Sequence, residues 1–252
     1  MLKVENLTCS YGQVCVLNEI SFTVSANKKL FIVGPNGCGK TTLLKAIAGI
    51  IPIQGEITIE GHQMADFHKK ARAKKVAFLS QISKVYFPYS VYETVMQGRY
   101  AHLKNRFFKG ETAVDKEVVL SCLELTGLLK LKDKSIDELS GGQLQRVFLA
   151  RVLAQQPNII LLDEPTNHLD LRYQLELMHY LDQWVKAPQR LVVGVVHDMN
   201  LALSFADELI ILKDGAIFAW DRCEALDLEV INQTFETDVT AYMQQSLKKW
   251  LR

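Results

Sequence analysis

The sequence predicts an α/β fold with a mixed sheet, an antiparallel β subdomain at the N-terminus and a helical subdomain inserted in the middle. Apolar and polar residues alternate near the N-terminus, as they do in strands with one wet face. Apolar runs typical of buried strands, each followed by a helical pattern, occupy the C-terminal part. The stretch between these regions has helical periodicity. We expect one domain over 1–252, with 1–84 and 156–252 forming the α/β core and β subdomain, and 85–155 forming the helical subdomain.

The first elements are strands and a helix that surround a glycine-rich loop. Strands are expected over 20–24 and 57–59, where apolar residues occur at every second position. Residues 29–33 form a mostly apolar run that leads into the glycine-rich loop. A helix is expected over 41–48, because Gly49 is placed to end it.

The middle of the chain carries helix signals. Ser90 and Ser140 each begin a stretch with the spacing of a capping box, in which a Glu or Gln follows three residues later. Residues 112–126 have apolar side chains at helical intervals, and Gly127 follows them. These signals support the helical subdomain over 85–155.

The α/β pattern then resumes. Strands are expected over 159–162 and 191–196, and helices over 171–185 and 199–206. Two further strands, 209–212 and 216–220, flank the hairpin signal Asp214-Gly215. The tail after Leu226 has weak patterning, which predicts neither a structure nor a role for it.

Composition excludes several classes of protein. The 252 residues carry a formal net charge of +1, which does not suggest a nucleic-acid binder. No apolar run approaches the ~20 residues that a membrane helix needs, and the N-terminus lacks the apolar core of a signal peptide. The five cysteines show neither metal-ligand nor CxxC spacing. We therefore expect a cytoplasmic protein. If it acts at a membrane, we expect it to do so through a partner protein.

The glycine-rich loop fits the pattern G-x-x-x-x-G-K-[ST] of a P-loop NTPase. Glycines let backbone N–H groups curl around phosphate oxygens, and the following helix points its positive end at the same anions. Lys40 is expected to reach the β- and γ-phosphates, Thr41 to ligate Mg²⁺, and Thr42 to face the α-phosphate. The alternative is an ordinary turn between a strand and a helix. The expected ATP contacts here are Asn36, Gly37, Cys38, Gly39, Lys40, Thr41 and Thr42.

An apolar strand over 159–162 delivers two carboxylates at its end. Asp163 is suited to hold Mg²⁺, usually through water. Glu164 is suited to polarise the attacking water as a general base. The alternative is a polar strand end that caps the next helix.

The stretch Leu139-Ser140-Gly141-Gly142-Gln143 matches the signature LSGGQ of ATP-binding cassette (ABC) ATPases letter for letter. It is also a well-capped helix start, but capping does not require two glycines, which cost helix stability. The sequence therefore resembles an ABC ATPase over residues 2 to 220.

Other family motifs occur in the expected order. Tyr11 matches the aromatic residue that stacks on adenine, Gln81 the Q-loop glutamine, 167–170 the D-loop and His197 the switch histidine. The resemblance assigns catalysis to Glu164, His197 and Gln81, and Mg²⁺ binding to Thr41, Gln81 and Asp163. His168 stands where many family members have Ala.

Family members bind two ATP between two cassettes arranged head to tail. The resemblance therefore implies a homodimer in which Ser140, Gly142, Gln143 and Asp170 contact nucleotide, with the signature acting on the phosphate loop of the other subunit. It also implies that closure on ATP binding is passed to integral membrane permease subunits.

A finer resemblance concerns the transported solute. Residues 92–102 resemble the "TVxxGRxPH" stretch of cassettes that serve ferric-siderophore, haem and cobalamin importers, and 197–203 resemble their "HDLNLAL". The alternative for 92–102 is a plain amphipathic helix. The resemblance implies an importer with separate membrane subunits and a substrate-binding protein, peripheral to the cytoplasmic side of the inner membrane. It places the surface that receives the permease at 98–102.

Two other functions stay open at this point, namely a soluble ABC ATPase of the iron–sulfur assembly type and a separate-chain exporter cassette. The sequence does not name the solute, the membrane subunits or whether the partner cassette is identical. A last expectation concerns Cys38, which lies at a helix N-terminus beside Lys40. That setting predicts a lowered thiol pKa and a reactive thiolate, the alternative being a shielded, inert thiol.

Overall fold

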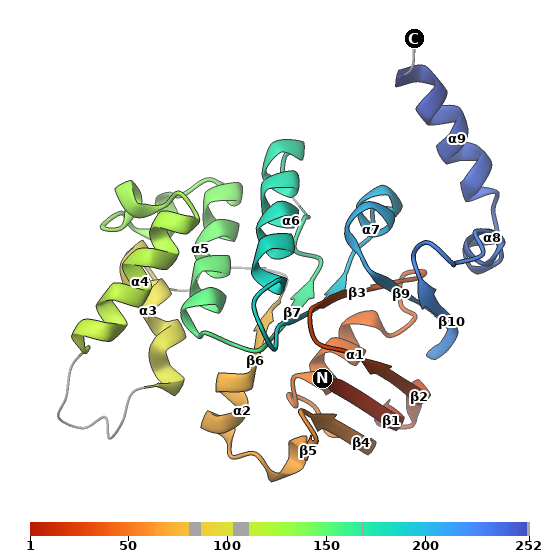
Figure 1. Ribbon diagram of the computed structural model, residues 1–252, viewed down its shortest axis with the longest axis horizontal. Coiled ribbons are helices and arrows are strands. Elements are labelled where there is room, and N and C mark those ends of the chain that lie inside the picture. The colour runs from red at the N-terminus through yellow and green to blue at the C-terminus, as the bar shows by residue number, and fades with distance from the viewer. Residues whose placement is uncertain (81–86, 103–110, 168, 251–252) are drawn as a thin grey trace.

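A computed structural model describes residues 1–80, 87–102, 111–167 and 169–250 as two sheets with helices around them (Figure 1). The N-terminal sheet is antiparallel, with the strand order β2-β1-β4-β5. Its strands are β1 (Leu2–Tyr11), β2 (Val14–Val24), β4 (Gln54–Ile59) and β5 (His62–Gln63). This sheet is the antiparallel β region that the alternating pattern predicted.

The second sheet has the order β10-β9-β3-β8-β7-β6. It is mixed, as predicted, because β10 runs antiparallel to β9 while the other neighbours are parallel. The β9–β10 hairpin turns at Asp214 and Gly215, which have φ angles of 48° and 77°. The strands are β3 (Lys28–Val33), β6 (Val76–Leu79), β7 (Ile159–Asp163), β8 (Leu191–Val195), β9 (Glu208–Lys213) and β10 (Ala216–Arg222).

Helices flank this sheet, and four short 3₁₀ turns, at 64–66, 97–101, 129–131 and 136–138, connect elements in the described residues. The capping boxes predicted at Ser90 and Ser140 are formed. Residues 171–185 are helical as predicted, and the tail contains α8 and α9, which the sequence pattern did not indicate. The helices are α1 (Lys40–Ile47), α2 (Lys69–Lys75), α3 (Val91–Met96), α4 (Ala113–Leu125), α5 (Gly141–Ala154), α6 (Leu171–Val185), α7 (Met199–Phe205), α8 (Glu229–Phe235) and α9 (Val239–Trp250).

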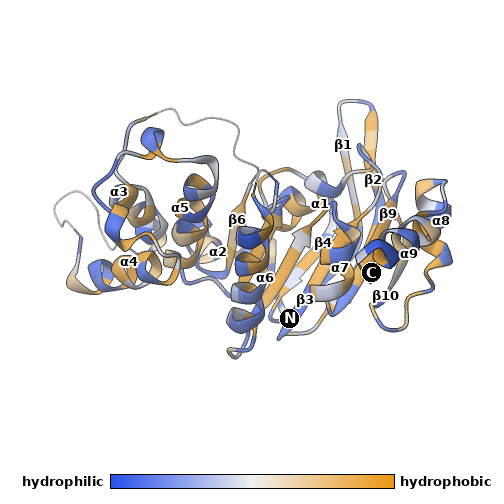
Figure 2. Ribbon diagram, turned by 90° about the horizontal axis from the view of Figure 1, so that it is seen from above, coloured by the Kyte–Doolittle hydropathy of each residue, from blue (hydrophilic) through white to orange (hydrophobic). Residues whose placement is uncertain are grey.

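The mixed sheet separates two hydrophobic cores. Alternate residues of β3 point to opposite faces, so Phe31 and Val33 belong to one core, and Leu30 and Ile32 to the other. The first core lies under α5, α6 and α7, and the second contains α1 and the antiparallel sheet (Figure 1). Figure 2 shows α6 with hydrophobic residues along one side and hydrophilic residues on the other.

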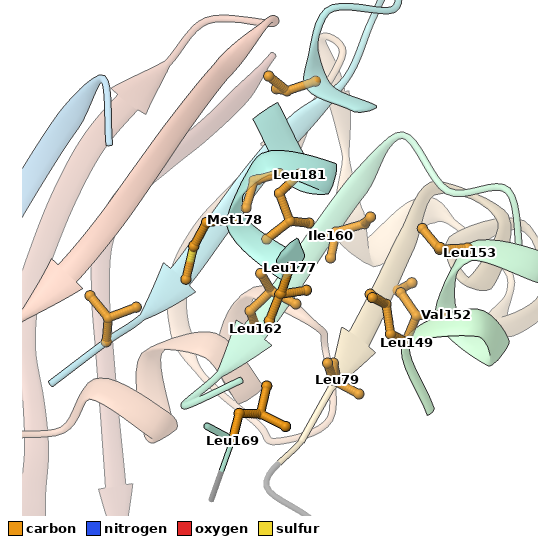
Figure 3. Close-up of a cluster of buried hydrophobic side chains, with 14 of the residues drawn as sticks. Leu79, Leu149, Val152, Leu153, Ile160, Leu162, Leu169, Leu177, Met178 and Leu181 are labelled. Atoms are coloured by element: carbon orange, nitrogen blue, oxygen red, sulfur yellow. The ribbon is translucent and has the colours of Figure 1, made fainter. Parts of the chain in front are cut away.

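The helical part is joined to the sheet by continuous packing. Leu149 and Val152 of α5 lie beside Leu79 of β6, and Leu177 of α6 covers Leu162 of β7 (Figure 3). Each such buried aliphatic side chain contributes about 1.5–3 kcal/mol relative to an exposed one. Helix α5 is thereby held at a fixed place beside β6.

The segment 98–102, where the resemblance implies that the permease docks, is mostly buried. The Arg99 side chain is buried, and its Nε donates to Asp115 Oδ1 at 2.8 Å while its Nη1 donates to the Ala154 carbonyl at 2.7 Å. His102 Nε2 lies 2.8 Å from the Gln155 carbonyl. These side chains tie α4, α5 and the 97–101 turn together, so only Tyr100 of this stretch is well exposed.

The Arg99–Asp115 pair gives a prediction about acid stability. Burial raises the pKa of Asp115, but hydrogen bonds from Arg99 and Thr112 outweigh it and leave the pKa below its ordinary value. A depressed folded-state pKa means that the stabilisation is present above about pH 4 and is lost as pH falls through the folded-state pKa. We expect Asp115→Asn to lower the free energy of unfolding by about 3 kcal/mol at pH 7.

The difference between Asp115→Asn and wild type should shrink as the pH falls below about 4. Urea unfolding at several pH values measures it. Asp133→Asn, at an exposed carboxylate, is the control and should stay within about 0.5 kcal/mol of wild type. A constant difference from pH 7 to pH 3 would contradict the prediction.

Candidate functional site

The predicted site residues gather at one edge of the mixed sheet. Because β3, β8 and β7 are parallel neighbours, their carboxyl ends meet there. The glycine-rich loop 34–39 follows β3, and His197 follows β8, while Asp163 ends β7 and Glu164 comes directly after it. Ligands of open α/β sheets bind at this edge. Gln81, which follows β6, lies outside the described residues.

The loop 34–39 is shaped by glycines at two tight places. A Cβ on Gly34 would lie 2.0 Å from the Leu212 carbonyl oxygen, and a Cβ on Gly39 would lie 2.7 Å from the Leu17 side chain. Gly39 also has a φ of 103°, which L side chains rarely adopt. Asn36 and Gly37 at the loop tip are exposed. The loop therefore presents backbone to solvent at the N-terminus of α1.

Lys40 is folded into its own loop. Its Nζ donates to the carbonyls of Gly34 and Pro35, both at 2.8 Å, and the side chain is buried. Neutral carbonyls are weaker partners for an ammonium group than an anionic phosphate oxygen would be. The lysine is thus placed where an incoming phosphate can compete for it.

Thr41 and Asp163 fit a Mg²⁺ site. Thr41 Oγ1 donates to Asp163 Oδ1 at 2.8 Å, and the carboxylate is only 5% exposed. Burial raises the pKa of Asp163. The hydrogen bond from Thr41 lowers this pKa and the charge of Glu164 raises it, so that the net shift is upward. The charge of a divalent cation would offset this cost, and Thr41 and Asp163 offer the oxygen ligands that Mg²⁺ prefers. In the described part of the chain no three His, Cys, Asp or Glu side chains converge on a metal.

The Glu164 carboxylate is held at both oxygens. Oε1 lies 2.5 Å from His197 Nε2, and Asn167 Nδ2 donates to Oε2 at 2.5 Å. The Glu164 backbone has a φ of 52°, and its N–H donates to the Val195 carbonyl of β8 at 3.1 Å. A non-glycine residue in this left-handed region costs about 1–3 kcal/mol and is often found at functional sites. The strand end is therefore bent so that Glu164 faces His197.

The stretch 139–143 is placed differently. Ser140 caps α5 through the Gln143 N–H, and the Ser140 N–H donates to Gln143 Oε1. A Cβ on Gly141 would meet no atom within 4 Å, so this helix start is open to solvent. Both views show α5 apart from α1, with β6 and α6 between them, and Figure 1 also shows β7 there (Figures 1 and 2). Ser140, Gly142 and Gln143 thus lie away from their own phosphate loop.

The remaining residues predicted to contact ATP lie in different places. Asp170 caps α6 by accepting from the Tyr173 N–H at 3.1 Å, which is a structural task. Tyr11, at the end of β1, is 51% exposed and so available for stacking. Thr42 lies in the first turn of α1 beside Thr41. Asn167 was noted from the sequence only as part of the D-loop stretch 167–170 and was given no role, although an Asn three residues after a predicted base is a signal that could have suggested one.

A model of the ABC transporter family matches residues 17–167. The chain belongs to this family. As an ABC ATPase it binds and hydrolyses ATP, and its fold is the α/β cassette of that family. ABC cassettes dimerise, and in importers they act with membrane permease subunits. No helix within the described ranges has the length and apolar character needed to cross a bilayer.

Curated relatives resemble the cassette along most of its length. It is 39% identical over 250 residues to the uncharacterized ABC transporter ATP-binding protein YvrA of Bacillus subtilis, covering 98% of this chain but only 56% of YvrA. It is 34% identical to the petrobactin import ATP-binding protein FpuD of Bacillus anthracis, over 94% of this chain and 85% of FpuD. It is 36% identical to the ferric enterobactin transport ATP-binding protein FepC of Escherichia coli, over 86% of this chain and 80% of FepC.

Solved structures show the same architecture. A metal-chelate type ABC transporter in an inward-facing conformation is 29% identical, with a TM-score of 0.80 over 93% of the cassette and 88% of that chain. The dimeric ABC transporter cassette MJ0796 is 28% identical, with a TM-score of 0.80 over 90% of the cassette and 100% of that chain. The fold expected for an ABC ATPase is confirmed.

The prediction that the thiol pKa of Cys38 is lowered is wrong. Burial raises the pKa of the Cys38 thiol and outweighs the lowering effect of Lys40 and of the backbone. The side chain is 7% exposed and would lie 3.0 Å from a Cβ on Gly34. Sequence placed the thiol correctly at a helix N-terminus but could not show that it points into the protein.

We therefore expect Cys38 to react slowly with iodoacetamide in the folded cassette. Cys15, which is exposed, should be alkylated first at pH 7.5, because access and thiolate content both control the rate. Mass mapping over time measures both sites, and urea-unfolded protein provides the control in which the rates converge. Labelling of Cys38 as fast as Cys15 in the native protein would contradict the structure.

Proposed function

We propose that this chain is the ATP-hydrolysing subunit of an ABC importer for metal chelates, with ferric siderophores as the first candidate. The observation that carries the hydrolytic part is the convergence of the phosphate loop, Asp163, Glu164 and His197 at one sheet edge. The importer part is supported by FepC and FpuD, whose names give ferric enterobactin and petrobactin as their solutes.

Each side chain has a defined task in this proposal. Backbone N–H groups of 34–39 bind the phosphates, and Lys40 leaves its two carbonyls to contact the β- and γ-phosphates. Thr41 and Asp163 would hold Mg²⁺, which would supply positive charge beside the phosphate oxygens. Gln81 is a further proposed ligand. Asn36, Gly37, Cys38, Gly39 and Thr42 contribute to the phosphate cradle, and Tyr11 stacks on adenine.

Glu164 acts as the general base. Its carboxylate accepts a proton from water as the water oxygen attacks the γ-phosphorus and the bond to the β-phosphate oxygen breaks, giving ADP and phosphate. His197 Nε2, which lies 2.5 Å from Glu164 Oε1, contacts the γ-phosphate and orients the Glu164 carboxylate toward the attacking water. The rate gain comes from position and charge neutralisation.

The complete site is formed between two copies. The α5 N-terminus lies away from its own phosphate loop and is open to solvent, which supports contact with nucleotide bound to the other subunit. Ser140, Gly142, Gln143 and Asp170 act across that interface. The homodimer binds integral permease subunits, and a substrate-binding protein delivers the solute. In this proposal the cassette lies on the cytoplasmic side of the inner membrane.

The test is the ATPase rate of the cassette reconstituted with the membrane protein that co-purifies with it. Purified binding protein is added either empty or loaded with ferric siderophore, haem, cobalamin, an amino acid or a sugar. Stimulation by a loaded metal chelate supports the proposal. Stimulation by the amino acid or sugar alone would overturn the solute class, and a cassette recovered only from cytosol would favour a soluble ABC ATPase.

A further inference from the structure

Asn167 is a donor aimed at the proposed catalytic base. Its Nδ2 donates to Glu164 Oε2 at 2.5 Å, and its backbone N–H donates to the Glu164 carbonyl at 3.2 Å. The two contacts close a tight turn over 164–167. The side-chain contact is the only one of the two that a substitution can remove.

The rest of this loop is fixed without Asn167. Gln145 of α5 donates to the Pro165 carbonyl at 2.8 Å, and Gln174 of α6 donates to the Leu169 carbonyl at 2.9 Å. Buried packing of Leu169 adds to these bonds. Loss of the Asn167 amide should therefore free the Glu164 carboxylate while leaving the loop backbone in place.

The carboxylate needs this second support. His197 contacts only Oε1, so a single contact would let the carboxyl group rotate about its terminal torsion. A donor on Oε2 removes that freedom. Reaction rates depend steeply on such alignment, since a misplacement of about 1 Å costs about 100-fold.

We propose that Asn167 is a positioning residue that orients the Glu164 carboxylate toward the attacking water. The inference rests on the proposed role of Glu164 as general base. Asn167 does not touch the phosphates in this reading, and it acts only through Glu164. It ties the geometry of the base to the loop that leads to Asp170 and α6.

Two substitutions separate orientation from bulk. Asn167→Ala removes the donor, and we expect kcat to fall about 10- to 100-fold with KM for ATP changed less than about twofold. Asn167→Asp keeps the shape but sets a second carboxylate against Glu164, so kcat should fall further than in Asn167→Ala. Asn158→Ala, at the opposite end of β7, is the matched control and should keep wild-type kcat.

A double-mutant cycle gives a readout that a purely structural role would not move. In a Glu164→Gln background, Asn167→Ala should lower the residual rate less than twofold, because the base that it orients is already gone. Thermal unfolding and ATP binding of each variant show that the fold persists. Wild-type kcat in both Asn167 variants would overturn the inference while leaving Glu164 as base. Full activity of Glu164→Gln would overturn the proposed base first, and the positioning role with it.

Discussion

Glu164→Gln should lower kcat for ATP hydrolysis about 1,000-fold, within the range that a general base contributes. The amide keeps the size of the side chain and can still contact His197 and Asn167, so the bent backbone at φ 52° is unaffected. What is lost is the negative oxygen that accepts a proton from water. The phosphate loop, Lys40 and the Thr41–Asp163 pair remain, so ATP affinity should stay within a few-fold of wild type.

The measurement is single-turnover hydrolysis alongside equilibrium ATP binding, because the two together separate chemistry from affinity. The variant should also accumulate as an ATP-bound dimer in size-exclusion chromatography, since closure precedes hydrolysis. Glu224→Gln, at an exposed carboxylate after β10, is the control and should behave as wild type. Turnover by Glu164→Gln at the wild-type rate would remove Glu164 from its proposed role.

Periodicity and turn chemistry predicted most of the fold. The helix over 171–185 and the Asp214-Gly215 hairpin were confirmed because each depends on local patterns, an amphipathic stripe in one and two positive φ angles in the other. Helix α9 was missed for a related reason. Its large apolar residues Tyr242, Leu247 and Trp250 are exposed, so they do not mark a buried face.

The sequence predicted which residues form the candidate site, but their relative positions could be seen only in the folded structure. The pattern around Lys40 shows what binds phosphate, but not that the lysine is folded onto the carbonyls of its own loop. The expected lowering of the Cys38 pKa was wrong, and the burial of Arg99 was not predicted, because burial is decided by tertiary packing. Arg99 lies in the stretch 92–102 that resembles an importer motif, yet its side chain is buried. The cost of burying its charge is offset by Asp115 and by the Ala154 carbonyl.

We expect ATP binding to be recovered when two inactive variants of the chain are mixed. One carries Lys40→Ala, which breaks its own phosphate loop, and the other carries Ser140→Arg, which places a bulky cation at the open α5 N-terminus. Each homodimer has two damaged sites. In a head-to-tail mixed dimer both lesions fall into one site and leave the other intact, so about half of the dimers formed at equal mixing contain one whole site.

Mixing should therefore restore ATP binding to about a quarter of the wild-type sites, together with nucleotide-dependent dimerisation. A matched control is Ser90→Arg, which removes the same kind of capping box from α3 without touching the proposed interface. Its homodimer should bind ATP normally, which separates a lost helix cap, worth about 1 kcal/mol, from a blocked site. If each subunit instead used its own α5 N-terminus, every site in the mixture would carry a lesion and nothing would be recovered. Absence of recovery, with mixed dimers demonstrated by tagged subunits, would therefore exclude the arrangement in trans. The separation of α5 from α1 across β6, β7 and α6 is the structural reason to expect recovery.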